Sequence, residues 1–317
     1  MTSGSTISPD LLNDAYNKIV SGESFRPSSA DEIAKLARLG FTSVDGEVKV
    51  SDDTELLDLQ LISNFLSENL KGRLSEVEIL PCVESTNDLM QERARSISID
   101  GMVVMAEVQT AGRGRRGRRW ETPFGKNIAM SLGVGLDIPA SRVAPLSLVV
   151  GIATAEALQA VGVPNVGLKW PNDILVDERK VGGILTELAT VTRPVEVVVG
   201  IGINVGGAAS IRDKVEYPIA DVCDYVQGAI RNQLAGELIN RVVLNCERFE
   251  ESGLATFLQR WPALDVLYGR QVAITGPQER MEGRAQGIDS EGRFLLEDDI
   301  GKMHATIAGD VSLRELP

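Results

Sequence analysis

The sequence has little of the residue types on which several common chemistries depend. Its 317 residues include one histidine, His304, so most histidine-based nucleophile and metal chemistries are excluded. Its three cysteines, Cys82, Cys223 and Cys246, are odd in number, far apart and without metal-ligand spacing. This argues against a disulfide framework or a zinc site. We therefore expect a protein of a reducing compartment, the cytoplasm.

Membrane-spanning runs and excess positive charge are also lacking. No apolar run reaches the length of a membrane span, and residues 1–5 lack the basic flank and apolar stretch of a secretory signal. We expect no membrane partner. The net charge is -13, whereas a surface devoted to nucleic acid needs a basic face to replace condensed counterions. Any contact with a polyanion must therefore be local.

Residues 1–58 predict a small N-terminal domain. We expect helices over residues 11–20 and 31–39, separated by a turn at 27–29, and a hairpin over 44–50. Helix, helix, hairpin is the order of a winged helix-turn-helix, so DNA binding must be considered.

The charge of this domain argues against that role. It holds five Lys and Arg against eleven Asp and Glu, a net charge of -6, and there is room for too few helices. A helix that reads the major groove needs basic and amide side chains at its start, whereas this one opens with Asp31 and Glu32. We interpret the domain as a degenerate winged-helix-like unit, with DNA binding and repression left as the less favoured alternative.

The rest of the chain predicts a larger mixed domain followed by a small β domain, so the fold class is α+β. Apolar residues at helical spacing predict a linking helix over residues 56–70. Strands are expected at 78–83, 102–108, 127–136, 167–170, 173–176, 181–188 and 195–205, with helices at 85–93, 144–161, 231–251 and 255–264. Short alternating segments over 271–313, broken by glycines, predict a small barrel. The expected limits are 59–268 for the central mixed α/β domain and 269–317 for the C-terminal one.

The first candidate site is the segment from Gly112 to Trp120, here called the arginine loop. It has five arginines and three glycines in an otherwise acidic chain and lies between two expected strands. Glycines let the backbone approach a ligand, and guanidinium groups form bidentate contacts with phosphate or carboxylate oxygens. A solvated basic patch and a nucleic-acid segment are the alternatives. Its place inside a folded domain favours a small phosphorylated ligand.

The second candidate runs from Lys169 to Asp173 and from Arg179 to Leu185. In the simplest interpretation Trp170 belongs to the core and Lys180 is a surface lysine in a turn. Gly182-Gly183 follows Lys180 at the start of a strand, where glycine normally weakens the sheet. This favours a lysine held over open backbone, as a point charge for an anionic group.

The third candidate is Gly200–Val205, a strand with two glycines that ends in an amide side chain. It is weak alone, because such strands also occur at bulges, and it lacks the context of a dinucleotide fingerprint.

Together with Ser85-Thr86-Asn87 and Gln109, these segments resemble in order and spacing those of the bacterial biotin protein ligases, also called biotin–[acetyl-CoA-carboxylase] ligases. The resemblance covers about residues 56–315. It implies a catalytic domain of the biotin/lipoate ligase type and a C-terminal SH3-like barrel. The implied reaction joins biotin to ATP as biotinyl-5'-AMP, with Mg, and passes biotin to a lysine of a biotin carboxyl carrier domain.

The resemblance also implies the site residues. The biotin pocket would be formed by Ser85, Thr86, Asn87, Gln109, Gly112 and Gly183, with Arg113, Gly114 and Arg115 closing over it and Lys180 at the biotin carboxylate and the α-phosphate. Lys180 and Arg115 would be catalytic. Trp120 would pack near the adenine, Asn172 and Asn204 would face the nucleotide and its Mg, and Arg314 would reach the ATP phosphates. We expect the arginine loop to order only with biotin or its adenylate, Arg116, Arg118 and Arg119 giving electrostatic support or carrier contacts.

The sequence departs from the family in two places. Some members carry an N-terminal winged helix that represses biotin synthesis genes, but here that unit is acidic. At Lys302-Met303-His304 there is no tryptophan of the kind the family leads us to expect. Lipoate and octanoate ligases share the fold and form an alternative, although the complete arginine loop and Lys169–Asp173 favour biotin. Whether the protein is a monomer or a homodimer stays open.

Overall fold

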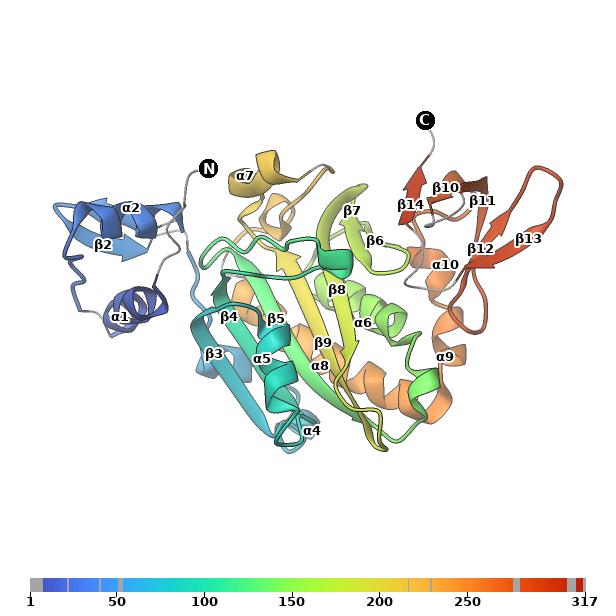
Figure 1. Cartoon of the computed structure of the whole chain (residues 1–317), viewed down its shortest axis with the longest axis horizontal. Coiled ribbons are helices and arrows are strands. Elements are labelled where there is room, and N and C mark those ends of the chain that lie inside the picture. The colour runs from blue at the N-terminus through green and yellow to red at the C-terminus, as the bar shows by residue number, and fades with distance from the viewer. Residues whose placement is uncertain are drawn as a thin grey trace.

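The structure, a computed structural model, describes residues 8–21, 23–39, 41–50, 54–215, 217–228, 230–275, 280–306 and 312–315. Three units follow one another along the long axis: an N-terminal unit, a central sheet domain and a small C-terminal sheet domain (Figure 1). Within the described ranges, no helix is long and apolar enough to cross a membrane.

The N-terminal unit has the expected order of two helices and a hairpin. Its elements are α1 (Pro9–Val20), α2 (Ala30–Arg38), β1 (Phe41–Val44) and β2 (Glu47–Val50). Ser29 caps α2 by accepting a hydrogen bond from the Glu32 N–H at 3.2 Å. Asp45 and Gly46 have φ of 52° and 77°, as the tight turn of a two-residue hairpin requires. The capping serine and the Asp-Gly turn, both visible in the sequence, therefore determine where α2 begins and where the hairpin turns.

The central domain is built on a seven-stranded mixed sheet in the order β3-β4-β5-β9-β8-β7-β6. Its strands are β3 (Glu76–Val83), β4 (Met102–Gln109), β5 (Asn127–Leu136), β6 (Val166–Lys169), β7 (Asp173–Val176), β8 (Arg179–Leu188) and β9 (Val195–Asn204). Only the pair β3 and β4 is parallel. Each expected strand is present within two residues at either end, and the mixed α/β domain is confirmed.

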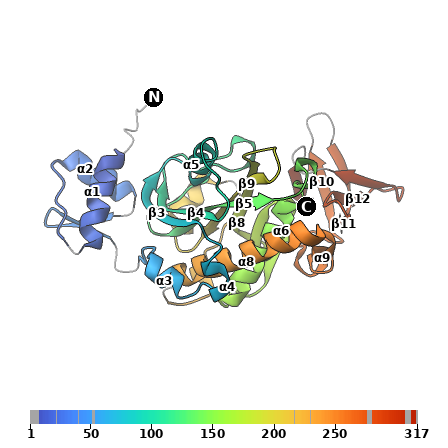
Figure 2. The same ribbon diagram turned by 90° about the horizontal axis from the view of Figure 1, so that it is seen from below.

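Helices cover both faces of this sheet. The long helices α6 (Leu146–Ala160) and α8 (Arg231–Ser252) pack together on one face, and α5 (Thr86–Arg93) lies on the other (Figures 1 and 2). α6 is apolar on nearly all sides because it lies between the sheet and α8. The main core therefore fills the α6 and α8 face, and the α5 face is left to carry polar groups.

The expected helix over residues 56–70 is wrong, because two short helices, α3 (Leu59–Ser63) and α4 (Glu68–Lys71), stand in its place. Asn240 of α8 interrupts it: its Nδ2 donates to the Phe65 carbonyl at 2.7 Å, and its Oδ1 accepts from the Ser67 N–H at 2.9 Å. Backbone groups that would continue the helix are thus bonded elsewhere. A local pattern gives no sign of such a distant partner.

The expected helix over residues 255–264 is also divided, into α9 (Ala255–Leu258) and α10 (Trp261–Leu264). Pro262 explains the division, since proline has no N–H to donate and its ring collides with the carbonyl four residues earlier, at Leu258. Further short turns are η1 (Arg115–Gly117), η2 (Ala140–Arg142), α7 (Ala208–Ile211), η3 (Arg212–Lys214) and η4 (Val222–Asp224).

The C-terminal domain is an antiparallel five-stranded sheet in the order β13-β12-β11-β10-β14. Its strands are β10 (Gln271–Thr275), β11 (Arg280–Ile288), β12 (Phe294–Glu297), β13 (Met303–Thr306) and β14 (Ser312–Glu315). Trp170, the residue after β6, is seated against this domain: its ring centroid lies 5.4 Å from that of Phe294, and its Nε1 donates to the Gly292 carbonyl at 3.1 Å. Trp170 is 1% exposed, so its expected place in the core is confirmed.

Candidate active site

Three glycines of β8 and β9 leave the α5 face of the sheet open to other groups. A Cβ on Gly200 would lie 2.2 Å from Asn87 Oδ1, and one on Gly202 would lie 2.4 Å from the Trp120 ring. Gly183 is the neighbour of Gly202 across the two strands. Side chains at Gly200 and Gly202 would collide with Asn87 and Trp120, so these glycines let both groups lie directly on the sheet. The two glycines of β9 thus provide a flat surface on which side chains lie, and they do not mark a bulge.

A cluster of hydrogen-bonded polar side chains, here called the polar cluster, lies where α5 begins. Ser85 caps α5 by accepting from the Asp88 N–H at 3.3 Å. The Thr86 N–H and hydroxyl both donate to Gln109 Oε1, at 2.8 and 3.2 Å. The hydroxyl of Ser131 donates to Asn87 Oδ1 at 2.6 Å and lies 2.8 Å from Thr86 Oγ1. Ser85, Thr86, Asn87 and Ser131 are almost fully buried and Gln109 is partly exposed; such a network can hold a small polar ligand in one orientation.

Glu187 joins the polar cluster to the arginine loop. Its carboxylate accepts from Asn87 Nδ2 at 2.8 Å and from both terminal nitrogens of Arg113, at 3.1 and 2.9 Å. Arg113 also pairs with Asp88 at 2.5 Å. The guanidinium of Arg113 is thus held by two carboxylates of the surrounding elements, which fixes the start of the loop beside α5.

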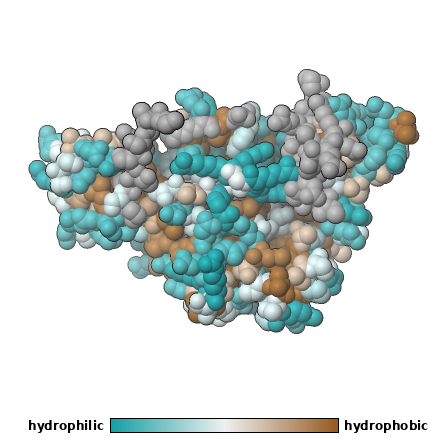
Figure 3. Space-filling model, viewed as in Figure 1, coloured by the Kyte–Doolittle hydropathy of each residue, from teal (hydrophilic) through white to brown (hydrophobic). Residues whose placement is uncertain are grey.

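The arginine loop itself forms a narrow turn across the sheet. The Trp120 N–H donates to the Gly112 carbonyl at 2.9 Å and the Gly114 N–H to the Arg118 carbonyl at 2.7 Å. Arg116 and Gly117 both have positive φ, 59° and 72°. In the space-filling view hydrophilic side chains gather over the middle of this face, where the loop crosses the sheet (Figure 3).

The arginines of the loop divide into two kinds. Arg115 is partly buried, with its NH1 3.4 Å from Asn172 Oδ1, whereas Arg116, Arg118 and Arg119 are exposed. Burial lowers the pKa of Arg115, and the positive charges of Arg116 and Arg118 lower it further. A partly dehydrated guanidinium close to other cations favours an anionic ligand.

Lys180 is not a surface lysine. Its Nζ lies 2.5 Å from Asp173 Oδ1 and 5.0 Å from the centre of the Tyr217 ring, and its side chain is 16% exposed. The pairing of β7 with β8 shifts by one residue here, since Leu175 faces Lys180 and Ile174 faces Gly182. This bulge sets the direction of the lysine relative to the glycine pair that follows it.

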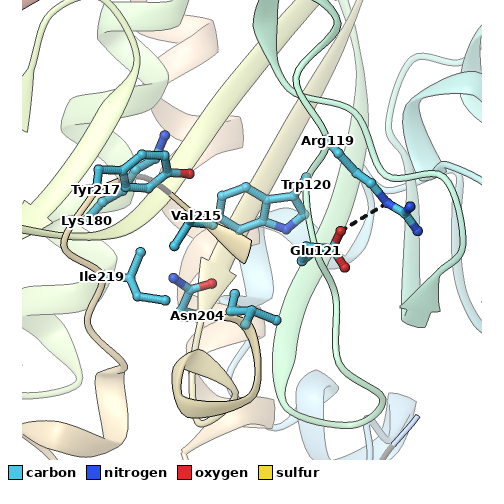
Figure 4. A pocket seen from close by; sticks show the side chains of 9 residues that line it. Arg119, Trp120, Glu121, Lys180, Asn204, Val215, Tyr217 and Ile219 are labelled. Atoms are coloured by element: carbon cyan, nitrogen blue, oxygen red, sulfur yellow. Dashed lines mark ion pairs between the residues drawn. The ribbon is translucent and has the colours of Figure 1, made fainter. Parts of the chain in front are cut away.

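Trp120, Lys180 and Asn204 line one hollow with an empty volume of about 280 Å³, part of which is open to solvent. The other lining residues are Arg119, Glu121, Ile211, Val215, Tyr217 and Ile219. In Figure 4 the indole lies between Lys180 with Tyr217 on one side and the Arg119–Glu121 ion pair on the other. The Trp120 Nε1–H is buried and finds no hydrogen-bond acceptor within the described ranges. An aromatic face beside a cation suits a nucleotide.

The structure thus brings the expected site residues into two adjoining places on one face of the sheet. Of those expected at biotin, Ser85, Thr86, Asn87 and Gln109 form the polar cluster, and Gly112 lies against Gln109. Lys180, also expected at biotin, lines the hollow with Trp120 and Asn204, and Gly183 lies beside it. Arg115 contacts Asn172, the sequence neighbour of the Asp173 that pairs with Lys180. The backbone of Arg314 lies in β14 opposite Ala273, but its side chain lies outside the described residues.

Among the polar residues of the site that carry no role in the sequence-based assignment are Ser131, Asp173, Glu187 and Tyr217. Asp173 stands inside the quoted Lys169–Asp173 motif, so its pairing with Lys180 could have been suspected. The other three enter through strand pairing and loop contacts that no local pattern reveals. In the described part of the chain, no group of three or more His, Cys, Asp and Glu side chains could hold a metal ion.

The glycines of β8 and β9, the polar cluster and a cation beside an indole together suit a class of protein that holds a small polar ligand next to a nucleotide. Comparison with known proteins then identifies the family. Residues 79–204 match the Biotin/lipoate A/B protein ligase family, and residues 267–314 match the Biotin protein ligase C terminal domain.

Individual relatives agree with these matches. The bifunctional ligase/repressor BirA of Salmonella typhimurium is 34% identical over 86% of this chain and 83% of its own length. The biotin–[acetyl-CoA-carboxylase] ligase of Mycobacterium tuberculosis is 34% identical over 82% of this chain and 98% of its own. The structure of a biotin protein ligase from Aquifex aeolicus in complex with biotin and ATP has a TM-score of 0.67 at 26% identity, covering 77% of this chain and all of that one. The chain belongs to the bacterial biotin protein ligase family, and the resemblance inferred from the motifs is confirmed.

Proposed function

We propose that this protein is a biotin protein ligase that activates biotin with ATP to biotinyl-5'-AMP and transfers biotin to a lysine of a biotin carboxyl carrier protein. The observation that carries this conclusion is that the polar cluster around Thr86 and the hollow of Trp120 and Lys180 lie on the same face of the sheet, in a chain of this family. Relatives bear the ligase name, and the Aquifex aeolicus structure contains biotin and ATP.

The first step joins two anions. An oxygen of the biotin carboxylate attacks the α-phosphorus of ATP, the bond to the bridging oxygen breaks, and pyrophosphate leaves. Because like charges approach, the protein must supply positive charge and alignment. Lys180 and Arg115 supply both. Lys180 is held by Asp173, and Arg115 by the neighbouring residue, Asn172. No acid-base histidine is needed, which agrees with the single histidine of the chain.

The second step consumes the mixed anhydride. The neutral amine of a carrier lysine attacks the acyl carbon and loses a proton to water, an amide bond forms, the bond from that carbon to the phosphate oxygen breaks, and AMP leaves. Lys180 is placed to stay with the phosphate as negative charge returns to it. The arginine loop, held by Glu187 and Asp88 at Arg113, would shield the adenylate from water until the carrier arrives.

We assign the site residues on this basis. Biotin binding falls to Ser85, Thr86, Asn87, Gln109, Gly112, Arg113, Gly114, Arg115, Lys180 and Gly183. Nucleotide binding falls to Trp120, Asn172, Asn204 and Arg314. The support is the network of hydrogen bonds around Thr86 and Gln109 for the first set, and for the second the shared hollow of Trp120 and Asn204 together with the motif position of Asn172 and Arg314.

Magnesium would arrive with ATP. The side chains nearby offer oxygen atoms, with the Asn172 amide beside the Asp173 carboxylate and the Asn204 amide in the hollow. Mg²⁺ prefers oxygen ligands and keeps several waters, so a site made mainly of phosphates and water with few protein groups fits these residues. When bound, the ion neutralises charge on the phosphate oxygens.

We also make proposals for the domains on either side of the central one and for the cellular location. We infer an SH3-like barrel for residues 269–317, supported by the five short antiparallel strands, and a degenerate winged helix for residues 1–58, supported by its order of elements. The central catalytic domain would then run over 59–268. We also infer a cytoplasmic enzyme, since the reaction consumes ATP and the three cysteines are free. Its partner is the carrier domain of acetyl-CoA carboxylase, as the name of one relative suggests.

The deciding experiment mixes the chain with biotin, ATP, Mg and a carrier domain. We expect pyrophosphate release that depends on biotin, and a biotin-labelled carrier. Lipoate in place of biotin is the matched control, because ligases for that acid share the fold. Absence of both products with biotin, or a clear preference for lipoate, would refute the proposal.

A repressor role is the second candidate, because one relative is named a bifunctional ligase/repressor. The net charge of -6 over residues 1–58 opposes it. A gel shift at stated salt with adenylate present would decide: sequence-specific retardation supports the role, and retardation lost as salt rises, on any DNA, refutes it.

A further inference from the structure

Phe124 connects the N-terminal unit to the segment that carries Trp120. It belongs to the central domain and follows Trp120 by four residues, yet its ring lies in the core of the N-terminal unit. Its ring centroid is 4.3 Å from that of Phe41 and 6.3 Å from that of Tyr16, and the side chain is 3% exposed. Its N–H donates to the Leu39 carbonyl at 3.3 Å. One short segment therefore has the N-terminal unit at one end and the nucleotide hollow at the other.

The segment between Trp120 and Phe124 has no regular secondary structure, since residues 120–123 belong to no helix or strand. Backbone bonds fix its two ends, from the Trp120 N–H to the Gly112 carbonyl and from the Gly125 N–H to the Glu107 carbonyl. Side-chain bonds reach Thr122 and the Glu121 carbonyl at 3.4 Å, near the limit for a hydrogen bond. The Trp120 ring lies on Gly202 at one end, and the buried Phe124 ring anchors the other end in the N-terminal unit.

The N-terminal unit can act as a fixed platform because its linker is also tied to the central domain. Glu107, which is fully buried, accepts from the Leu57 N–H at 2.7 Å and pairs with Arg231 at 2.6 Å. The Glu55 carboxylate accepts from the Arg231 N–H at 2.6 Å and from Asn232 Nδ2 at 2.7 Å. The unit is therefore held at Phe124 and where α1 packs against β3, and the chain that follows it is tied down at Glu55 and Leu57.

We propose that Phe124 is a positioning residue and that the N-terminal unit is the platform that holds Trp120 over Gly202 for the nucleotide. This inference rests on the proposed function, in which Trp120 packs near the adenine. Losing the anchor weakens nucleotide binding more than biotin binding, because Ser85, Thr86 and Asn87, at the start of α5, lie outside the segment that Phe124 holds. By linkage, the nucleotide must in turn tighten the contact between Phe124 and Phe41.

The test uses the full chain with Phe124→Leu and, on the other side of the contact, Phe41→Leu. Both should raise the KM for ATP about tenfold, with the KM for biotin changed less than about twofold, because a small displacement near reacting groups has a large effect. Phe257→Leu is the matched control: Phe257 is 2% exposed in α9, away from the N-terminal unit, and its loss should move neither KM.

Two further measurements separate positioning from general instability. The double variant should raise the KM for ATP no more than either single variant, since both changes break one contact. Hydrogen exchange at residues 41–50 should slow when biotin and ATP are added to the wild-type chain, and should not slow in Phe124→Leu. Equal rises in both KM values, or an equal effect of Phe257→Leu, would overturn the inference.

The failure of the inference is distinguishable from the failure of the proposed function. If the wild-type chain releases no pyrophosphate with biotin, both the proposed function and this inference are refuted. If the wild-type chain is active and Phe124→Leu keeps its KM for ATP, only the inference is overturned.

Discussion

The Nζ of Lys180 lies 2.5 Å from the Asp173 carboxylate, so the cation assigned to the reaction is already held by an anion. Together with the Tyr217 ring, this pairing keeps a flexible lysine in one direction over the glycines of β8 and β9. A phosphate or carboxylate that reaches Lys180 shares it with Asp173. The pair therefore orients the lysine without saturating it, since an ammonium has three protons to donate.

Lys180→Ala should slow the formation of biotinyl-5'-AMP by about 10²–10³-fold, because one donor aimed at developing charge contributes that much. Pyrophosphate release in single-turnover mixing measures the rate. Circular dichroism should show an unchanged fold, and Lys302→Ala, an exposed lysine of the C-terminal domain, should keep the wild-type rate. Unfolding of Lys180→Ala would mean that the lysine is structural.

Asp173→Asn should slow the same step about tenfold, because the lysine loses the partner that orients it. If Asp173 acts through Lys180, the double variant Asp173→Asn with Lys180→Ala should be no slower than Lys180→Ala alone. Additive losses in that cycle would show that Asp173 acts independently of the lysine.

Arg115→Ala should also slow adenylate formation by about 10²-fold, since it removes a partly dehydrated cation next to Asn172. Arg116→Ala is the matched control, because Arg116 is the next residue of the same loop and its side chain is exposed. The two rates are compared under identical biotin and ATP. Equal losses would indicate that the loop acts through its net charge alone.

Gly200→Ala and Gly202→Ala should separate the two ligands. A methyl group on Gly200 meets the Asn87 amide, whereas one on Gly202 meets the Trp120 ring. We expect Gly200→Ala to weaken biotin binding and Gly202→Ala to weaken ATP binding, each about tenfold or more, since neither neighbour can yield without leaving the site. Isothermal titration with each ligand alone checks this, and the reverse pattern would contradict the assignment of the two pockets.

The buried ion pair of Glu107 and Arg231 should matter for stability. Glu107→Ala leaves the Arg231 charge buried without its partner, which costs about 3–5 kcal/mol in the free energy of unfolding. Thermal unfolding should therefore shift downward by about 10 °C. Glu92→Ala, at an exposed position of α5, is the control and should leave the midpoint unchanged.

Much of the central domain could be predicted from the sequence, because its signals are local. The cap at Ser85, the apolar run of β5 and the glycine pair after Lys180 each act within a few residues. The motifs also predicted the family, which the comparisons confirm.

What could not be predicted depends on partners far along the chain. The linking helix breaks because Asn240 bonds Phe65 and Ser67. Glu187 enters the site because β8 carries it beside Asn87, and Phe124 leaves its own domain to pack on Phe41. In each case a tertiary contact overrides the local preference of the sequence. The neighbouring residues alone therefore cannot predict these features.

Gly200 and Gly202 are successive residues of β9 on the same face, which puts them about 6.8 Å apart. The strand therefore fixes the separation between the Asn87 amide and the Trp120 ring, which lie on these two glycines. Under the proposed assignment, this is the separation between the acid and the adenine, whatever the length of either molecule. An acid with a longer tail would then have to extend toward the start of α5, so the proposed assignment places selection by length at Ser85 and Asn87.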